Sequence, residues 1–165
     1  MSAEQKTTPQ TALPIPAHGR LLGLDFGTRR VGVAVSDVEQ RYAAALEVIL
    51  RSSAKGDAAA LLRIVEENLP VGFVIGLPVH MSGDEGTKAK QAREFGIWAG
   101  RVAGLPVAYW DERHSSTIAE GRLIGAGVSE KKRQAKLDAI AAQIMLQSYL
   151  DATDRSRWTT RRGNT

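Results

Sequence analysis

Four acidic side chains are the residues of this sequence best suited to chemistry. Asp25 lies inside an otherwise apolar run, and Asp111 and Glu112 directly follow another apolar run. Asp138 lies in an alanine-rich segment with helical spacing. A carboxylate inside an apolar strand is costly to bury unless it is paired or binds a cation. These four positions therefore indicate a functional site.

Two of the acids also have a simpler interpretation. Asp25 would cap the turn at Gly27, a common role for an aspartate at the end of a strand. Asp138 would be a solvated helix acid that pairs with Gln134 or Lys131. Both interpretations are compatible with the sequence.

The elements that must position these acids are predicted from hydrophobic periodicity. Residues 21–37 form two apolar runs around a short glycine-containing turn, which is typical of a hairpin, and a third strand is expected over 42–50. The chain then alternates helices and strands, with Pro70 and Gly104 ending the first two helices. These expected elements are a helix at 56–69, a buried strand at 71–77, a helix ending before Gly104, a strand at 106–110, a helix at 115–124, and a helix from Ser129 to about 150. The last helix is expected to pack through Leu137, Ile140, Ala141, Ile144, Met145 and Ser148.

This order predicts an α/β fold with a mixed five-stranded sheet. Three antiparallel strands come first, parallel βα units follow, and helices cover both faces. Functional residues gather outside the carboxyl ends of the parallel strands in such sheets. We therefore expect Asp25, the Asp111-Glu112 pair and Asp138 to meet at that edge.

Converging carboxylates repel one another unless cations screen their charge. Hard divalent ions such as Mg²⁺ and Mn²⁺ prefer oxygen sites of this kind, and two such ions can support cleavage of a phosphodiester. The sequence has neither a GxSxG nucleophile motif nor a GxxxxGK[ST] phosphate loop. A two-metal Mg²⁺ or Mn²⁺ nuclease is the activity that these residues predict.

The motifs also carry a family resemblance, which covers residues 20–150. The sequence closely resembles the YqgF family, also called RuvX, in four segments: LDFGTRRVGVAVSD, VIGLPVHMSGDEG, YWDERHSS and KLDAIAAQIMLQSYL. The resemblance implies an RNase H-like fold, a metal-dependent nuclease site and relationship to the Holliday junction resolvases. It implies a function in 5′ maturation of pre-16S ribosomal RNA, with junction resolution as the older assignment.

The resemblance also assigns the site. Asp25 matches the acid of the first strand, the Asp111-Glu112 pair matches the DER motif, and Asp138 matches the acid of the last helix. Many resolvases carry a catalytic glutamate on the fourth strand, where this chain has Gly76. The DER motif must then supply the missing acid. Since strand alternation places Asp111 and Glu112 on opposite faces, only one is expected to bind metal, and we favour Glu112.

Basic residues close to the acids are candidates for binding nucleic acid. Arg29 and Arg30 follow Asp25, and Arg113 follows the DER acids. A second group, Lys88, Lys90 and Arg93, lies on the predicted helix before Gly104. A solvated turn or helix face would explain the same residues without any ligand.

Composition narrows the class of protein. The chain has 165 residues, a formal net charge of +4, three histidines and no cysteine, which excludes disulfides and thiolate metal sites. No apolar run is long enough to span a bilayer, so no membrane contact is expected, and the cytoplasm is the expected location. We expect a flexible leader at 1–19, a nuclease domain at 20–152 and a flexible basic tail at 153–165.

The expected partners are RNA, above all precursor ribosomal RNA or its particles, or DNA, and the expected state is a monomer or weak homodimer. One alternative keeps the chemistry and changes the substrate to four-way junctions or single-stranded DNA. Another alternative is a non-catalytic RNA-binding factor for ribosome assembly. The Asp25-to-Thr28 segment also resembles the phosphate loop of actin-like ATPases, but the chain has room for only one of the two lobes that those proteins need.

Overall fold

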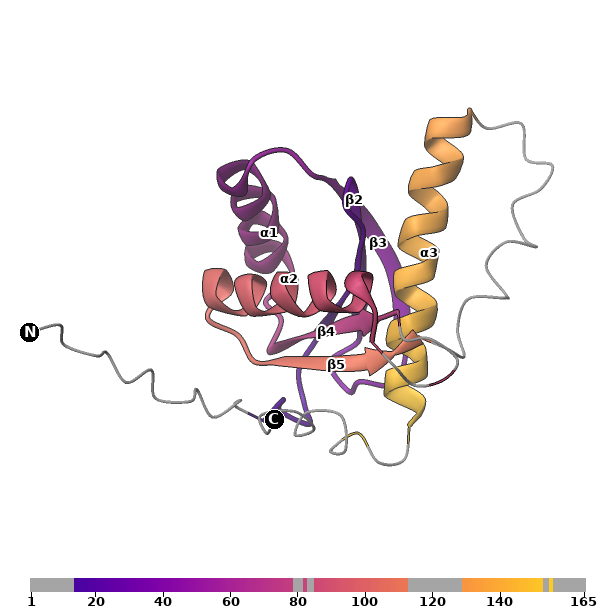
Figure 1. Cartoon of the computed structure of the whole chain (residues 1–165). Coiled ribbons are helices and arrows are strands. Elements are labelled where there is room, and N and C mark those ends of the chain that lie inside the picture. The colour runs from indigo at the N-terminus through magenta and orange to yellow at the C-terminus, as the bar shows by residue number, and fades with distance from the viewer. Residues whose placement is uncertain (1–13, 79–81, 83–84, 113–128, 153–154, 156–165) are drawn as a thin grey trace, which may run out of the picture.

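The computed structural model describes residues 14–78, 82, 85–112, 129–152 and 155 (Figure 1). Its eight elements follow the predicted order closely. They are β1 (Leu21–Phe26), β2 (Arg30–Ser36), β3 (Ala43–Leu50), α1 (Ala54–Asn68), β4 (Gly72–Leu77), α2 (Thr87–Ala103), β5 (Val107–Asp111) and α3 (Glu130–Asp151). The helix predicted at 115–124 lies outside the described residues.

The five strands form one mixed sheet in the order β3-β2-β1-β4-β5. The pairs β1–β2 and β2–β3 are antiparallel, whereas β1–β4 and β4–β5 are parallel. Parallel neighbours need a crossover connection, and α1 and α2 provide the helical part of the two crossovers. The predicted α/β architecture of an RNase H-like fold is confirmed.

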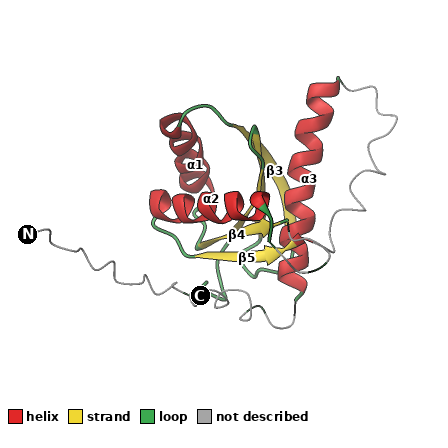
Figure 2. Cartoon of the chain, in the orientation of Figure 1, coloured by secondary structure: helices red, strands yellow, loops and turns green. Residues whose placement is uncertain are grey.

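Helices cover both faces of the sheet (Figures 1 and 2). Alternation along β1 sends Leu22 and Leu24 into the core beneath α1 and α2, and sends Leu21 into a second core beneath α3. All three leucines are fully buried. Each such side chain contributes about 1.5–3 kcal/mol of transfer free energy, so both faces hold the helices in place.

Helix α3 lies very close to the sheet because two glycines face it. A Cβ atom on Gly23 would meet Leu146 Cβ at 2.8 Å, and a Cβ atom on Gly32 would overlap the backbone oxygen of Asp138. The sheet therefore has no room for a side chain at either position. This close approach fixes the height of Asp138 above β1 and β2.

The predicted packing face of the last helix is partly wrong. Met145 is buried as expected, but Leu137, Ile140 and Ile144 are only half-buried. The buried residues of α3 are Ala139, Ala142, Met145, Leu146, Tyr149 and Leu150. The physical reason is the position of two glycines. Gly32 admits the helix backbone at Asp138 and Ala139, and Gly23 admits it at Ala142 and Leu146, so this side of α3 faces the sheet.

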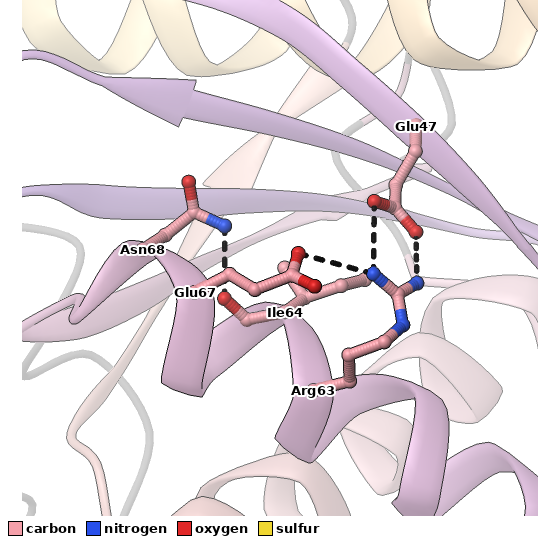
Figure 3. A network of polar contacts seen from close by, with 5 residues as sticks. All are labelled: Glu47, Arg63, Ile64, Glu67 and Asn68. Carbon is pink, nitrogen blue, oxygen red and sulfur yellow. Dashed lines mark hydrogen bonds and ion pairs between the residues drawn. The ribbon is translucent and has the colours of Figure 1, made fainter.

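Helix α1 begins two residues before its predicted start at 56 and ends at Asn68, close to the predicted stop at Pro70. Ser53 caps it by accepting a hydrogen bond from the Gly56 amide, and Leu69 ends it in the left-handed conformation just before Pro70. An ion-pair network ties its exposed side to the edge of the sheet, where Arg63 pairs with Glu67 and with Glu47 of β3 (Figure 3). These groups are solvated, so salt screens their attraction.

Residues 14–19 contact the domain rather than extending away from it. The Gln40 side chain donates to the Pro16 and Gly19 carbonyls, and Arg155 donates to Gln40 Oε1 at 3.1 Å. These bonds tie both ends of the described chain to the β2–β3 turn. The division into leader, domain and tail stays a prediction. No helix among the described residues is both long and apolar enough to cross a membrane.

Candidate nuclease site

Asp25 lies near the carboxyl end of β1, on the face that α3 covers. It is in register with Gly32 of β2, and alternation places it on the same side as Leu21 and Gly23. Burial raises the pKa of the Asp25 carboxyl. A hydrogen bond from Glu112 opposes this effect, and the nearby negative charge of Asp138 adds to it.

Glu112 follows β5 and reaches over Gly76 of β4. Trp110 is in register with Gly76, so Glu112 lies just beyond the paired part of the strand. A Cβ atom on Gly76 would overlap Glu112 Oε1, which shows that the Glu112 carboxyl fills the space above this glycine. The structure therefore places an acid from β5 where a side chain on β4 would otherwise stand.

Asp111 occupies the opposite face of the sheet. It pairs in register with Leu77, whose side chain belongs to the core beneath α1 and α2, and it is only 7% exposed. Alternation predicted that the two acids would separate in this way, and Glu112 was the one favoured as a metal ligand; that role stays a prediction. The hydrogen bond between Glu112 and Asp25 shows that Glu112 is the acid that lies beside Asp25.

Asp138 enters the site from α3 and brings a cationic partner. Arg30 Nε lies 2.6 Å from Asp138 Oδ2, and Gln134 Nε2 donates to Oδ1 at 3.2 Å. The pairing of Asp138 with Gln134 that the simpler interpretation predicted is thus present. The charge of Asp138 also raises the pKa of Asp25. Within the described part of the chain, no three acidic or histidine side chains cluster tightly enough to hold one metal ion. Asp138 is instead paired with Arg30, apart from the contact between Asp25 and Glu112.

Glu112 has the strongest electrostatic perturbation of the site. Burial, followed by the charge of Asp25, raises its pKa to about 9. The hydrogen bond to Asp25 and the charge of Asp111 act in the same direction. Near neutral pH, Glu112 and Asp25 therefore share a proton, because two partly desolvated carboxylates in contact resist ionising together without a compensating cation.

The predicted phosphate-binding residues have different surroundings. Arg29 is exposed at the β1–β2 turn, while Arg30 is engaged by Asp138. Lys88 and Lys90 are exposed on α2. Arg113 lies outside the described residues.

Arg93 differs from the two lysines on the same helix because its charge is already compensated. It forms a two-pronged ion pair with Glu85 at 2.7 and 2.6 Å. Its guanidinium group also lies 4.9 Å from the centre of the Tyr109 ring. The same contacts raise the pKa of Arg93.

Sequence reasoning missed the contacts that join distant segments. Arg30 and Asp138 are 108 positions apart, so only their opposite charge could have suggested a pair. Gly76 was recognised as a missing acid, but its role as the space for Glu112 depends on the register of β4 and β5.

A mixed sheet of this order, with carboxylates gathered at the carboxyl ends of β1 and β5, defines an RNase H-like domain with an acidic site. The family model described as "RuvX: Holliday junction resolvase" matches residues 19–152. The chain therefore belongs to the RuvX family, and the resemblance found in its motifs is confirmed.

Curated relatives of similar length match most of the chain. A protein of Bradyrhizobium sp. (strain ORS 278) named "Putative pre-16S rRNA nuclease" is 46% identical over 136 residues, covering 82% of this chain and 84% of the relative. A protein of the same name from Rhodopseudomonas palustris (strain BisB18) is 43% identical over 142 residues, covering 86% and 87%. Among solved structures, Thermus thermophilus RuvC matches with a TM-score of 0.47 and 21% identity, covering 79% of this chain and 93% of that chain.

Proposed function

We propose that this protein is a divalent-metal-dependent nuclease that hydrolyses phosphodiester bonds in RNA, with the precursor of 16S ribosomal RNA as its substrate. The observation that carries the proposal is the half-buried carboxylate pair of Asp25 and Glu112, with Asp138 close enough to perturb it. Membership of the RuvX family and the names of the relatives support it.

The carboxylates fit a hard divalent cation. Their oxygens are the donors that Mg²⁺ and Mn²⁺ prefer, and the repulsion that holds a proton on Glu112 would be relieved by a cation. Asp25 and Glu112 would hold the metal, with Asp138 as a further acid on the same face of the sheet. Asp111, on the opposite face, would act on the site only through its charge. When bound, such ions polarise the phosphate and lower the pKa of water.

The remaining residues would position the substrate. Arg30 fixes the orientation of the Asp138 carboxylate through a direct bond to Oδ2. Exposed Arg29 lies at the turn that follows Asp25, so it can contact a phosphate near the acids. Lys88 and Lys90 are exposed on α2 and can contact phosphates there, and Arg113 directly follows the acids in sequence. The proposed setting is the cytoplasm, on precursor ribosomal particles, with the protein as a monomer or weak dimer.

A DNA substrate is the second candidate, because the matching family model carries the description of a Holliday junction resolvase. Symmetric resolution of a four-way junction needs two copies of the active site related by a twofold axis. A protein that stays monomeric in the presence of junction DNA would exclude this candidate. A non-catalytic RNA-binding assembly factor would bind RNA and cut nothing.

A cleavage assay tests the proposal. Wild type, Asp25→Asn and the control Asp151→Asn, which changes an exposed acid at the end of α3, would be incubated with precursor 16S transcript, single-stranded DNA and a four-way junction. Each reaction would contain Mg²⁺, Mn²⁺ or chelator. We expect metal-dependent RNA cleavage that Asp25→Asn abolishes and Asp151→Asn retains. Cleavage that survives Asp25→Asn in a pure preparation would refute the site.

A further inference from the structure

A cavity of about 410 Å³ lies on the side of the sheet opposite Asp25, where β1 ends. Its size is within the range of small-ligand sites. Its walls come from the end of β1, the segment before and within the first turn of α1, and one side of α2. The lining residues are Phe26, Thr28, Arg51, Ser52, Ala54, Asp57, Gln91, Glu94, Phe95 and Trp98.

Flat groups dominate this cavity. The rings of Phe26 and Phe95 lie 5.0 Å apart, and those of Phe95 and Trp98 lie 5.5 Å apart. The Arg51 guanidinium group lies over Phe26 at 5.0 Å. Unpaired bases stack on aromatic rings and on guanidinium planes of this kind. The surface is therefore suited to a planar ring.

The charges of the cavity argue against a phosphate as its occupant. Arg51 contributes one positive charge, and its Nε lies 3.4 Å from Asp57 Oδ2. Asp57 and Glu94 contribute two negative charges, so the lining repels anions overall. Carboxylates accept hydrogen bonds from the amino groups of bases, and the Gln91 amide can both donate and accept. A neutral ring that carries an amino group fits this lining better than a phosphate does.

The cavity is also placed to receive a neighbour of the reacting nucleotide. Phe26 directly follows Asp25, and alternation sends the two side chains to opposite faces at the same end of β1. A nucleic acid strand that crosses the carboxyl end of β1 would pass from the carboxylates to the cavity. Resting on the proposed function, we propose that this cavity binds an unpaired nucleobase beside the cleaved phosphodiester bond.

This assignment makes single-stranded RNA the substrate class. A base inside a duplex is stacked and paired, so it would have to be pulled out before it could enter, at a cost in binding free energy. The arms of a four-way junction are paired throughout. The cavity therefore favours an unpaired segment of a precursor RNA over a junction.

An abasic scan of a short single-stranded RNA tests the proposal. Binding of the full-length protein would be measured by fluorescence anisotropy in chelator, with the base removed at one position at a time. We expect one position at which base removal weakens binding about 5- to 100-fold. In Trp98→Leu this penalty disappears, whereas Ile97→Ala, a control at an exposed neighbour outside the cavity, retains it.

A second variant keeps the test decisive if Trp98→Leu fails to fold by circular dichroism. Glu94→Gln changes an exposed side chain at the cavity rim and is expected to reduce the preference for cytosine over uracil at the same position. The base site is overturned by RNA binding with no position-specific penalty, by a penalty that persists in folded Trp98→Leu, or by a cytosine preference that Glu94→Gln leaves unchanged. In each case metal-dependent cleavage still supports the nuclease. Wild type that neither binds nor cuts the RNA overturns both proposals.

Discussion

The shared proton of Asp25 and Glu112 predicts an unusual dependence of stability on pH in the metal-free protein. The folded state raises the pKa of Glu112 from 4.5 to about 9, so the folded state binds more protons than the unfolded state between these values. Stability therefore falls as pH rises through this window. Since one pKa unit corresponds to about 1.4 kcal/mol, the full shift corresponds to about 6 kcal/mol, a large part of the stability of a typical domain.

Glu112→Gln removes the titrating group but retains an amide that can donate to Asp25. We expect this variant to lose most of the decline and to be more stable than wild type at pH 8.5. Urea denaturation in chelator at pH 5.5, 7.0 and 8.5 would measure the free energy of unfolding of both proteins. Glu66→Gln, at an exposed position of α1, is the control and should follow wild type. Wild-type stability that is flat or rises over this range, or an equal decline in Glu112→Gln, would refute the reasoning.

Three further predictions concern the geometry of the site. Gly76→Ala should displace the Glu112 carboxyl and reduce metal-dependent cleavage by about 100-fold, with little change in the urea midpoint because only a side-chain end must move. Gly32→Ala should cost about 1–3 kcal/mol in urea denaturation, because the new Cβ overlaps the backbone oxygen of Asp138 and must push α3 outward. Addition of Mn²⁺ should raise the melting temperature more at pH 8.5 than at pH 6, since a cation competes with the shared proton, and Asp25→Asn should abolish the shift. An equal shift at both pH values would contradict the third prediction.

Local signals were sufficient to predict most of the fold. The glycine turn between β1 and β2, the stop at Pro70 and the left-handed Gly104 that ends α2 each depend on a few neighbouring residues. Hydrophobic period then distinguished strands from helices. The packing face of α3 was not predictable in this way, because it depends on Gly23 and Gly32 in a distant part of the chain.

The sequence was sufficient to predict which residues form the candidate site, but not which of them contact one another. The motifs contain the three acids that come close together, Asp25, Glu112 and Asp138. The proton that the first two share depends on burial, which no spacing reveals. Arg30 was expected to bind phosphate, and its bond to Asp138 depends on how α3 docks against β2. The aromatic cavity likewise combines β1 and α2, which follow no common motif.

The close packing of α3 against Gly23 of β1 and Gly32 of β2 has a consequence for protein synthesis. Asp25 belongs to the first element of the described fold and Asp138 to the last, so Asp25 leaves the ribosome well before Asp138. Until that helix emerges, this face of the described sheet lacks the side chains of α3 that bury it, and the acidic site lacks Asp138 and its bond to Arg30. A nascent chain therefore cannot complete this arrangement of acids before α3 has been synthesised and has docked on the sheet.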